Sequence, residues 1–301
     1  MTRGLTLSGS GHGHCRVFSS VGDYWQLLKP RVMYLVVFTA IAGVFIAPGV
    51  LHPFIALVSV LCVAMGSGGA AALNMWYDSD IDAIMQRTKE RPVPAGRISR
   101  EQALECGITL SLLSVFLMAI VVNYTSAFLL LVSILFYVIV YTVILKRRTS
   151  QNIVIGGAAG AFPPLIGWTS VTGDMPSLES FILFAIVFLW TPPHFWALSI
   201  PGCQEYKAAG IPMLPVLSIR RTQTHILGYS IILSIVSLLP ALFSREPLLY
   251  GISVVSLNLV FLTRALAVYR EPQPSKSTCM ELFSYSIYYL FLTFSIVIIT
   301  S

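Results

Sequence analysis

Three oxygen-bearing side chains recur at intervals of four in the segment LNMWYDSDIDAIMQRTKERPVPAGRIS (73–99). On a continuing helix, Asn74, Asp78 and Asp82 fall on one face, about 6 Å apart along the axis. Two carboxylates and an amide oxygen suit Mg²⁺, which commonly takes one or two protein carboxylates together with water and substrate phosphate. The spacing therefore predicts a Mg²⁺ site, and a merely solvated polar segment is the alternative interpretation.

Basic side chains follow this acidic motif directly. Arg87, Lys89 and Arg91 can supply positive charge to phosphate oxygens. Asp80 lies about 200° round the helix from its acidic neighbours and should point elsewhere. Acidic side chains that could bind a metal, followed by basic side chains that could bind phosphate, predict that the substrate carries phosphate.

A second cluster lies in FYVIVYTVILKRRTSQN (136–152). Tyr137 and Tyr141 can share a helix face, and Lys146 and Arg147 follow them. One interpretation is an aromatic belt with snorkelling bases at a membrane interface. The other is that the tyrosines stabilise a cationic intermediate while Lys146 holds a leaving phosphate.

A third cluster lies in WTPPHFWALSIPGCQEYKAAGIPMLPV (190–216). His194 follows two prolines near the end of an apolar run, where it is either a hydrogen-bonded packing residue or a functional one. Glu205 is the only acid of this segment, and Lys207 follows it closely.

The elements that must position these clusters are membrane helices. Of 301 residues, 56% are hydrophobic and 11% charged, and the mean hydropathy is +0.79. Soluble domains carry about 25% charged residues, so this composition excludes a soluble or disordered chain. The net charge of +6 would suggest nucleic acid on a soluble protein, but here it indicates sidedness, and we expect no nucleic acid partner. The five cysteines form no CxxC pair.

Nine apolar stretches are long enough to span a bilayer, which takes about 20 residues each. They are 32–50, 53–76, 102–122, 125–145, 152–170, 178–199, 224–244, 247–266 and 281–300. Small residues in GSGGAAA (66–72) and GGAAGA (156–161) favour close helix packing. The expected fold is an all-α polytopic bundle of nine transmembrane helices embedded in the lipid bilayer.

Nearly all the basic residues are predicted to lie on the same side of the membrane. Of the nineteen Lys and Arg residues, all except Arg245 fall on the N-terminal segment and alternate connections. The positive-inside rule makes that side cytoplasmic, so Ser301 ends on the opposite side. We expect residues 1–24 to form a flexible cytoplasmic tail, in which GHGHC (11–15) is discounted as a metal site, and 25–301 to form one domain. The expected location is a bacterial inner membrane.

The three clusters together carry a resemblance to a known family. The first acidic motif of the UbiA superfamily of intramembrane prenyltransferases resembles NMWYDSDIDAIMQRTKERPVPAGRIS (74–99), and a second helix-end motif of that family is similar to YTVILKRRTSQN (141–152). The branch that farnesylates protohaem IX, giving haem O, looks most like WTPPHFWALS (190–199) with EYKAAGIPMLPV (205–216). The resemblance covers nearly the whole chain from about Trp25 and implies the nine-helix UbiA bundle.

The resemblance implies the following chemistry. Farnesyl diphosphate binds through Mg²⁺, and diphosphate leaves to give an allylic cation shielded inside the bundle. A vinyl group of haem B attacks, and water adds to give haem O. The implied catalytic residues are Asp78, Asp82, Lys146 and Tyr141; the implied substrate-binding residues are Asn74, Arg87, Lys89, Arg91, Tyr137, Arg147, His194, Glu205 and Lys207; the implied Mg²⁺ ligands are Asn74, Asp78, Asp82 and Glu205.

The sequence departs from the family pattern at its second acidic loop. The haem branch commonly places a basic residue before Asp-Tyr, whereas this chain has Gln204 before Glu205. A second Mg²⁺ held there is therefore less secure, and Lys207 or Arg91 is the expected source of compensating charge. His194 is the expected haem contact, through iron or through a hydrogen bond to a propionate or the diphosphate.

Three other functions compete with this one. A UbiA-type prenyltransferase acting on an aromatic or quinone precursor would share the acidic motif. A transporter would also have broken helices and membrane-edge acids, but here the acids gather on one side. A structural subunit of a respiratory complex would tolerate loss of the acids. Contact with haem A synthase or a terminal oxidase is an expected but unspecified partnership.

Overall fold

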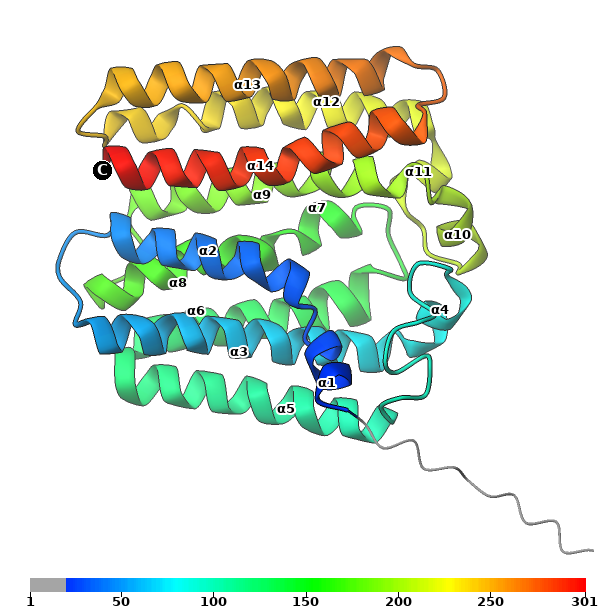
Figure 1. Cartoon of the computed structure of the whole chain (residues 1–301), viewed down its shortest axis with the longest axis horizontal. Coiled ribbons are helices and arrows are strands. Elements are labelled where there is room, and N and C mark those ends of the chain that lie inside the picture. The colour runs from blue at the N-terminus through cyan, green and yellow to red at the C-terminus, as the bar shows by residue number, and fades with distance from the viewer. Residues whose placement is uncertain (1–19) are drawn as a thin grey trace, which may run out of the picture.

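The computed structural model describes residues 20–301, and every regular element in that range is helical (Figure 1). In chain order the elements are α1 (Val21–Leu27), α2 (Pro30–Ile46), α3 (Pro53–Tyr77), α4 (Ser79–Ile84), α5 (Arg100–Leu117), η1 (Met118–Val122), α6 (Tyr124–Leu135), η2 (Phe136–Leu145), α7 (Asn152–Gly156), α8 (Ala158–Thr172), α9 (Leu178–Ser199), α10 (Cys203–Ala208), α11 (Leu214–Leu217), α12 (Ile219–Val236), η3 (Leu239–Leu242), α13 (Pro247–Arg270) and α14 (Lys276–Thr300). The predicted all-α class is confirmed.

Eight helical segments of the described range are long and apolar enough to cross a membrane. They are α3, α5 with η1, α6 with η2, α7 with α8, α9, α12 with η3, α13 and α14. The pair α1 and α2 makes a ninth only if it is taken as one span bent by 58°. The nine predicted spans thus correspond to eight unbroken spans and one broken span. Its break falls at Leu28 and Lys29, where Pro30 begins α2.

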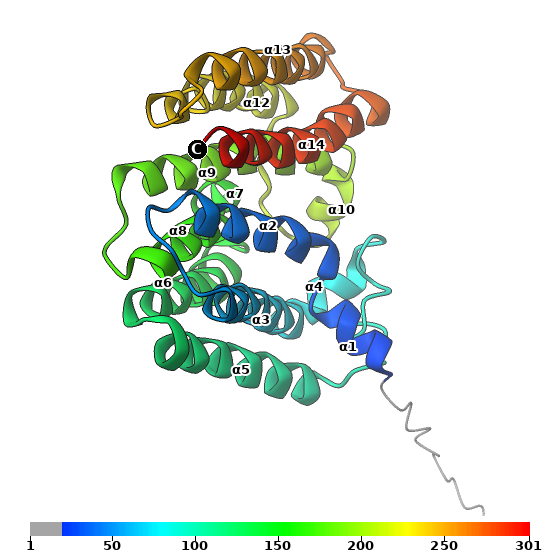
Figure 2. The same ribbon diagram turned by 60° about the vertical axis from the view of Figure 1, so that its left-hand side comes forward.

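The long helices lie side by side with their axes roughly aligned (Figures 1 and 2). The short helices α4 and α10 lie together at one end of the bundle, and the C-terminus lies at the other. We call the first end, formed by α4, the loop 85–99 and α10, the charged end. The connections therefore bring the first and third sequence clusters to the same end of the bundle.

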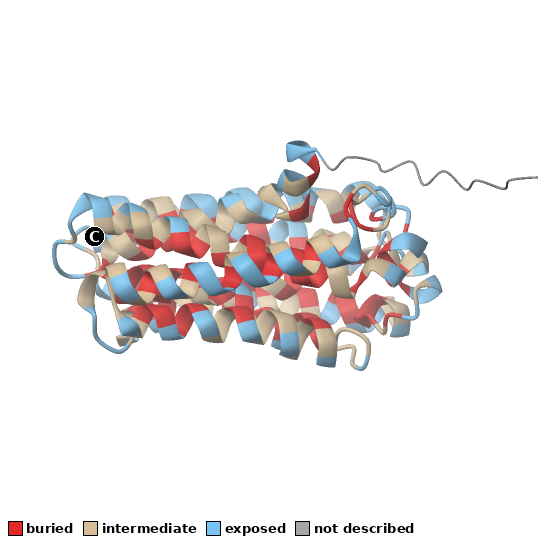
Figure 3. Cartoon of the chain, turned by 90° about the horizontal axis from the view of Figure 1, so that it is seen from below, coloured by how far each residue is buried: buried red, intermediate tan, exposed pale blue. Residues whose placement is uncertain are grey.

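Burial separates an inner from an outer surface (Figure 3). The inner faces carry fully buried aromatic side chains such as Trp168, Trp196 and Phe294, whereas Leu112, Phe116 and many other large apolar side chains are exposed. Exposed apolar surface on this scale is typical of contact with lipid. The chain is an integral membrane protein.

The helices α2 and α8 pack backbone against backbone. A methyl group on Gly167 would lie 2.0 Å from the backbone oxygen of Ala40, and one on Gly43 would lie 2.2 Å from that of Pro164. Small residues permit this approach between membrane helices. Gly43 and Gly167 lie outside the segments predicted for close packing. The close packing predicted for GSGGAAA (66–72) is seen between α3 and α5, where a methyl group on Gly69 would lie 2.9 Å from Gly107 O.

We expect Gly167→Ala to destabilise the protein, because its methyl group meets rigid backbone. Overpacking costs typically about 1–3 kcal/mol, which should lower the melting temperature of the detergent-solubilised protein. Gly228→Ala in α12 is the matched control, since a methyl group there meets no atom within 4 Å. Equal melting temperatures for Gly167→Ala and wild type would contradict the close approach of α2 and α8.

Part of the predicted tail lies outside the described residues. That part includes GHGHC (11–15) and ends at residue 19. The described residues begin with a capping box, in which the Ser20 hydroxyl accepts from Asp23 N and the Asp23 side chain accepts from Ser20 N. Helix α1 therefore begins at Val21, inside the segment 1–24 expected to form the tail.

Candidate active site

The acidic motif lies on a helix that is interrupted at Asp78. This residue ends α3 and precedes α4, yet its amide donates to Asn74 O at 2.9 Å and the Asp82 amide donates to Asp78 O at 2.8 Å. Because these helical bonds continue through the break, the three side chains stay on one face. All three residues are buried, with 3%, 0% and 2% exposure. The Asp80 side chain is 58% exposed and points away, as its spacing predicts.

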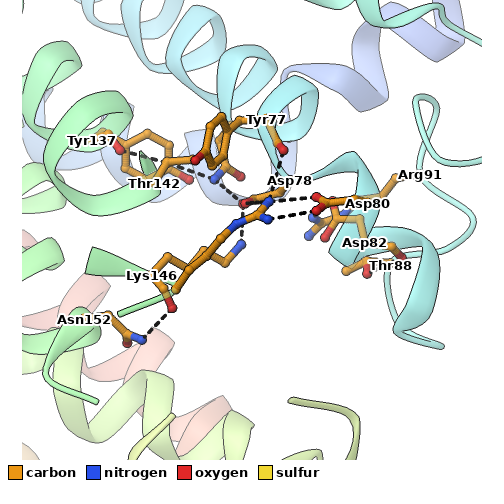
Figure 4. Close-up of polar contacts among 12 residues, drawn as sticks. Tyr77, Asp78, Asp80, Asp82, Thr88, Arg91, Tyr137, Thr142, Lys146 and Asn152 are labelled. Carbon is orange, nitrogen blue, oxygen red and sulfur yellow. Dashed lines mark hydrogen bonds and ion pairs between the residues drawn. The ribbon is translucent and has the colours of Figure 1, made fainter. Parts of the chain in front are cut away.

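Asp78 has one satisfied and one unsatisfied carboxylate oxygen (Figure 4). Oδ2 accepts from Asn74 Nδ2 at 2.8 Å and forms an ion pair with Lys146 Nζ. Arg147 Nη2 lies 3.6 Å from Oδ1, beyond hydrogen-bond distance, so Oδ1 is buried with no hydrogen-bond partner. Such an oxygen is costly in a protein interior and suits a cation that the protein itself does not supply.

Asn74 is held by three hydrogen bonds. Its Nδ2 donates to Thr142 Oγ1 at 3.0 Å as well as to Asp78, and its Oδ1 accepts from Lys29 Nζ at 2.6 Å. In the sequence, Lys29 indicated only the sidedness of the chain and Thr142 gave no signal beyond its place after Tyr141. Both residues belong to the site.

The basic loop folds back onto the acidic motif. Arg91 Nη1 donates to Asp82 Oδ2 at 2.6 Å, and Thr88 Oγ1 donates to Asp82 O at 2.9 Å. The loop is tied to α1 because Arg97 Nε donates to Asp23 Oδ1 at 2.6 Å. These contacts hold a guanidinium beside a buried carboxylate at the charged end.

Arg147 occupies the outer side of the same cluster. Its two terminal nitrogens donate to the two oxygens of Asp80 at 2.8 and 2.7 Å, and these bonds lower the pKa of Asp80 below its ordinary value. It also lies over the ring of Tyr77, with 4.9 Å from its guanidinium carbon to the ring centre. Arg147 is thus held mainly by an exposed carboxylate and only approaches Asp78.

A cavity of about 640 Å³ runs from the charged end into the bundle, a size typical of small-molecule sites. Its charged and polar lining includes Lys29, Arg31, Asn74, Asp82, Arg87, Arg91, Tyr137, Tyr141, Lys146, His194 and Tyr206. Its apolar wall includes Leu130, Ile134, Pro163, Val187 and Leu290. Charge at one end and hydrocarbon along the rest fit a substrate with an anionic head and a long apolar tail.

The two tyrosines of the second cluster line this cavity together. They lie on the π-helix η2, and their ring centres are 5.4 Å apart. Tyr141 packs against Gly156 of α7, where a methyl group would lie 2.2 Å from its Cδ2. π-Helical turns are frequent at functional sites. The structure thus places both rings where the sequence predicted, just inside the charged end.

His194 is held in one orientation in the cavity wall. Its ring lies between those of Trp190 and Phe283, with centroid distances of 4.2 and 4.6 Å, and its Nδ1 is 2.6 Å from Ser286 Oγ. The Ser286 hydroxyl donates its own proton to Phe283 O at 2.5 Å, so the Nδ1 proton must be the donor to Oγ. This pattern places a proton on Nδ1, and in the neutral ring that tautomer leaves the lone pair on Nε2.

The remaining predicted residues lie at the rim or outside it. Lys89 and Lys207 are exposed, Glu205 is half-buried, and none of the three lines the cavity. Their neighbour Tyr206 does, and its hydroxyl accepts from Arg87 Nη2 at 3.3 Å. The third cluster therefore reaches the cavity through several residues, of which only His194 was a predicted site residue: Trp190, Thr191, His194, Phe195, Leu198, Tyr206, Ile211 and Met213.

The donor set at the charged end fits Mg²⁺ with an incomplete protein shell. Within residues 20–301, no three His, Cys, Asp or Glu side chains are grouped to hold a metal ion. Asn74 and Asp82 line the cavity, and Asp78 Oδ1 is unpartnered behind them. Mg²⁺ usually completes such a set with water and substrate phosphate. The residues present therefore suit a metal that binds together with a phosphate-bearing substrate.

Sequence comparison gives the same family across the chain. The model of the UbiA prenyltransferase family matches residues 36–287. The protoheme IX farnesyltransferase of Anaplasma phagocytophilum is 65% identical, over 94% of this chain and 96% of its own length. That of Ehrlichia ruminantium strain Welgevonden is 57% identical, over 93% and 95%, and that of Rhizobium etli is 49% identical, over 93% and 90%.

Solved structures share the fold. A digeranylgeranylglyceryl phosphate synthase superposes with a TM-score of 0.74 at 17% identity, over 93% of this chain and 97% of its own. A UbiA homolog from Archaeoglobus fulgidus bound to GPP and Mg²⁺ superposes with a TM-score of 0.66 at 17% identity, over 91% and 99%. The membrane bundle, the acidic motif in its cavity and the family match agree: this chain belongs to the UbiA prenyltransferase family.

Proposed function

We propose that this protein transfers the farnesyl group of farnesyl diphosphate to a vinyl group of haem B, with addition of water, and so makes haem O and diphosphate. The observation that carries the proposal is one cavity lined at the charged end by Asp82 and Lys146, beside the buried Asp78, and elsewhere by His194. The close relatives named protoheme IX farnesyltransferase support the choice of donor and acceptor.

The charged end binds the diphosphate. When bound, Mg²⁺ supplies positive charge to the departing diphosphate, and Asn74, Asp78 and Asp82 are the residues that would hold it. Arg87, Arg91 and Lys146 line the same end and would donate to the remaining phosphate oxygens. Preorganised positive charge lowers the barrier because it is aimed at charge that grows in the transition state.

The apolar cavity handles the hydrocarbon chemistry. The bond between farnesyl C1 and oxygen breaks with its electron pair leaving on diphosphate, and the resulting allylic cation lies near the faces of Tyr137 and Tyr141. The vinyl π electrons of haem B form the new carbon–carbon bond. Water then adds to the remaining cation and loses a proton, which gives the hydroxyl group. No protein nucleophile is needed.

His194 positions the acceptor. Because its Nδ1 proton is donated to Ser286, the neutral ring offers Nε2 only as an acceptor or ligand. A hydrogen bond to a propionate or diphosphate oxygen would need a donor at Nε2. Axial ligation of the haem iron is therefore the favoured contact. The flat rings of Trp190 and Phe283 keep the imidazole from turning.

The membrane placement and the rim residues complete the proposal. The charged end faces the cytoplasm of a bacterium, the N-terminus lies on that side, and Ser301 lies on the other. Glu205, Lys89 and Lys207 act from the rim, so we expect them to guide diphosphate and metal into the site. Contact with haem A synthase or a terminal oxidase remains a prediction.

The proposed function predicts a defined product from purified protein in liposomes. Incubation with haem B, farnesyl diphosphate and Mg²⁺ should give a haem whose mass has increased by one farnesyl group and one hydroxyl, while EDTA should suppress it. In a parallel reaction, 4-hydroxybenzoate replaces haem B. Prenylation of 4-hydroxybenzoate with haem B recovered unchanged would instead support an aromatic prenyltransferase.

A further inference from the structure

Lys29 lies in an unusual position beside the predicted metal ligands. It occupies the break between α1 and α2 and is the one residue other than glycine, within 20–301, with a positive φ, at 53°. Pro30 disfavours the right-handed helical region for the residue before it. A residue other than glycine keeps a left-handed backbone conformation only when the surrounding structure holds it there. The fold therefore directs this ammonium group into the cavity.

The target of that ammonium group is fixed as well. The Thr142 hydroxyl donates its proton to Tyr137 O at 2.9 Å, so it must accept from the Asn74 amide nitrogen. The second amide proton goes to Asp78. Both donors of the Asn74 amide are thus used inward, and its oxygen can only face Lys29, at 2.6 Å.

We propose that Lys29 occupies the metal position at Asn74 in the substrate-free protein and moves to the diphosphate when metal and substrate bind together. An ammonium nitrogen 2.6 Å from Asn74 Oδ1 occupies one lone pair of that oxygen, and its positive charge opposes a divalent cation on the other. The inference rests on the proposed prenyl-diphosphate function. It adds a residue that withholds a metal ligand until the anionic substrate arrives.

The charges of the cavity account for the exchange. Each residue of the acidic motif already has one cationic partner: Lys29 at Asn74, Lys146 at Asp78 and Arg91 at Asp82. A metal alone must displace an ammonium group whose neighbouring carboxylates are already paired with Lys146 and Arg91. A metal with diphosphate brings phosphate oxygens to which that group can transfer its hydrogen bond. Metal and diphosphate binding should therefore be strongly coupled.

The test measures metal binding without any substrate. Mn²⁺, which prefers the same oxygen ligands, is titrated into the solubilised protein and its free form is followed by electron paramagnetic resonance. We expect Lys29→Met to bind Mn²⁺ about tenfold more tightly than wild type, because a charge-assisted hydrogen bond no longer competes. The same variant should bind inorganic diphosphate more weakly in the presence of Mn²⁺.

A double-mutant cycle separates the contact at Asn74 from a general loss of charge. In an Asn74→Ala background, Lys29→Met should change Mn²⁺ affinity by less than about twofold, because the contested oxygen is gone. Lys276→Met, which removes an exposed lysine at the start of α14, is the matched control and should leave both affinities unchanged. Size-exclusion profiles report folding of each variant.

Two results would overturn the inference. One is equal Mn²⁺ affinity, or undetectable binding, in wild type and Lys29→Met. The other is the same tightening by Lys29→Met with and without Asn74, which would indicate charge alone. Neither result depends on the acceptor, so a failure to farnesylate haem B would overturn the proposed function and leave the metal titrations to decide on Lys29.

Discussion

Replacing Asp78 with Asn is expected to reduce the rate of prenyl transfer by more than about 100-fold, the cost of removing one preorganised electrostatic group from an active site. The substitution keeps the shape of the side chain but removes its charge. It leaves the half-buried Lys146 ammonium without its counterion and converts Oδ1, which accepts no hydrogen bond, into a neutral atom. Diphosphate release should fall together with haem O formation.

Asp80→Asn is the matched control, two positions along the same motif. Its ion pair with Arg147 is exposed, and exposed pairs contribute at most about 1 kcal/mol, so we expect less than about a fivefold change in rate. Membrane insertion and the size-exclusion profile distinguish loss of chemistry from loss of fold. Wild-type haem O formation by a folded Asp78→Asn protein would remove the proposed role of the acidic motif.

The motif could be predicted because its spacing is local. Asn74, Asp78 and Asp82 stay aligned even though the helix breaks at Asp78, since the backbone bonds across the break keep the helical register. The long apolar spans could be predicted for a similar reason, because the bilayer fixes their length. The helices α7 and α9 confirm this, starting at the predicted residues 152 and 178.

The partners of the motif could not be predicted, because they come from distant parts of the chain. Lys29 reaches Asn74 across 45 positions, and Ser286 reaches His194 across 92. A lysine just before the first span looks the same in the sequence whether its side chain contacts lipid headgroups or a ligand. Only the packing of α1 and α2 against α3 decides between these positions.

The second acidic loop shows what position in a loop leaves open. The family resemblance implies Glu205 as a metal ligand, because it stands in the Asp position of that loop, whereas the neighbouring Tyr206 is the residue that lines the cavity. Helix α10 is only six residues long, and a shift of one residue on a helix turns a side chain by about 100°. The metal role of Glu205 therefore stays a prediction.

Replacing His194 with Ala is expected to weaken the binding of haem B by more than about 100-fold. Loss of a residue that only supports a metal ligand costs about 10–100-fold, and loss of the ligand itself should cost more. The variant loses the only imidazole lone pair that lines the cavity among residues 20–301. Haem B is titrated into the protein without farnesyl diphosphate, and the absorption spectrum reports both affinity and iron ligation. Added imidazole should restore the spectrum of the ligated iron.

Ser286→Ala tests how the lone pair is presented. Removing the hydroxyl leaves the Nδ1 proton of His194 without its acceptor, so the proton can move to Nε2 and compete with ligation. We expect haem affinity to fall about tenfold while the bound fraction keeps the ligated spectrum, because the ligand itself remains. If His194 were only a packing residue, Ser286→Ala would change neither the haem affinity nor the absorption spectrum of the bound haem.

His225→Ala provides the control for loss of a histidine. This residue of α12 lies edge-on against Trp196 and does not line the cavity, so its removal should leave haem affinity and spectrum unchanged. An unchanged spectrum in His194→Ala would eliminate axial ligation and leave His194 a packing residue between Trp190 and Phe283. A changed spectrum in His194→Ala alone would place the haem iron at the wall formed by α9 and α14.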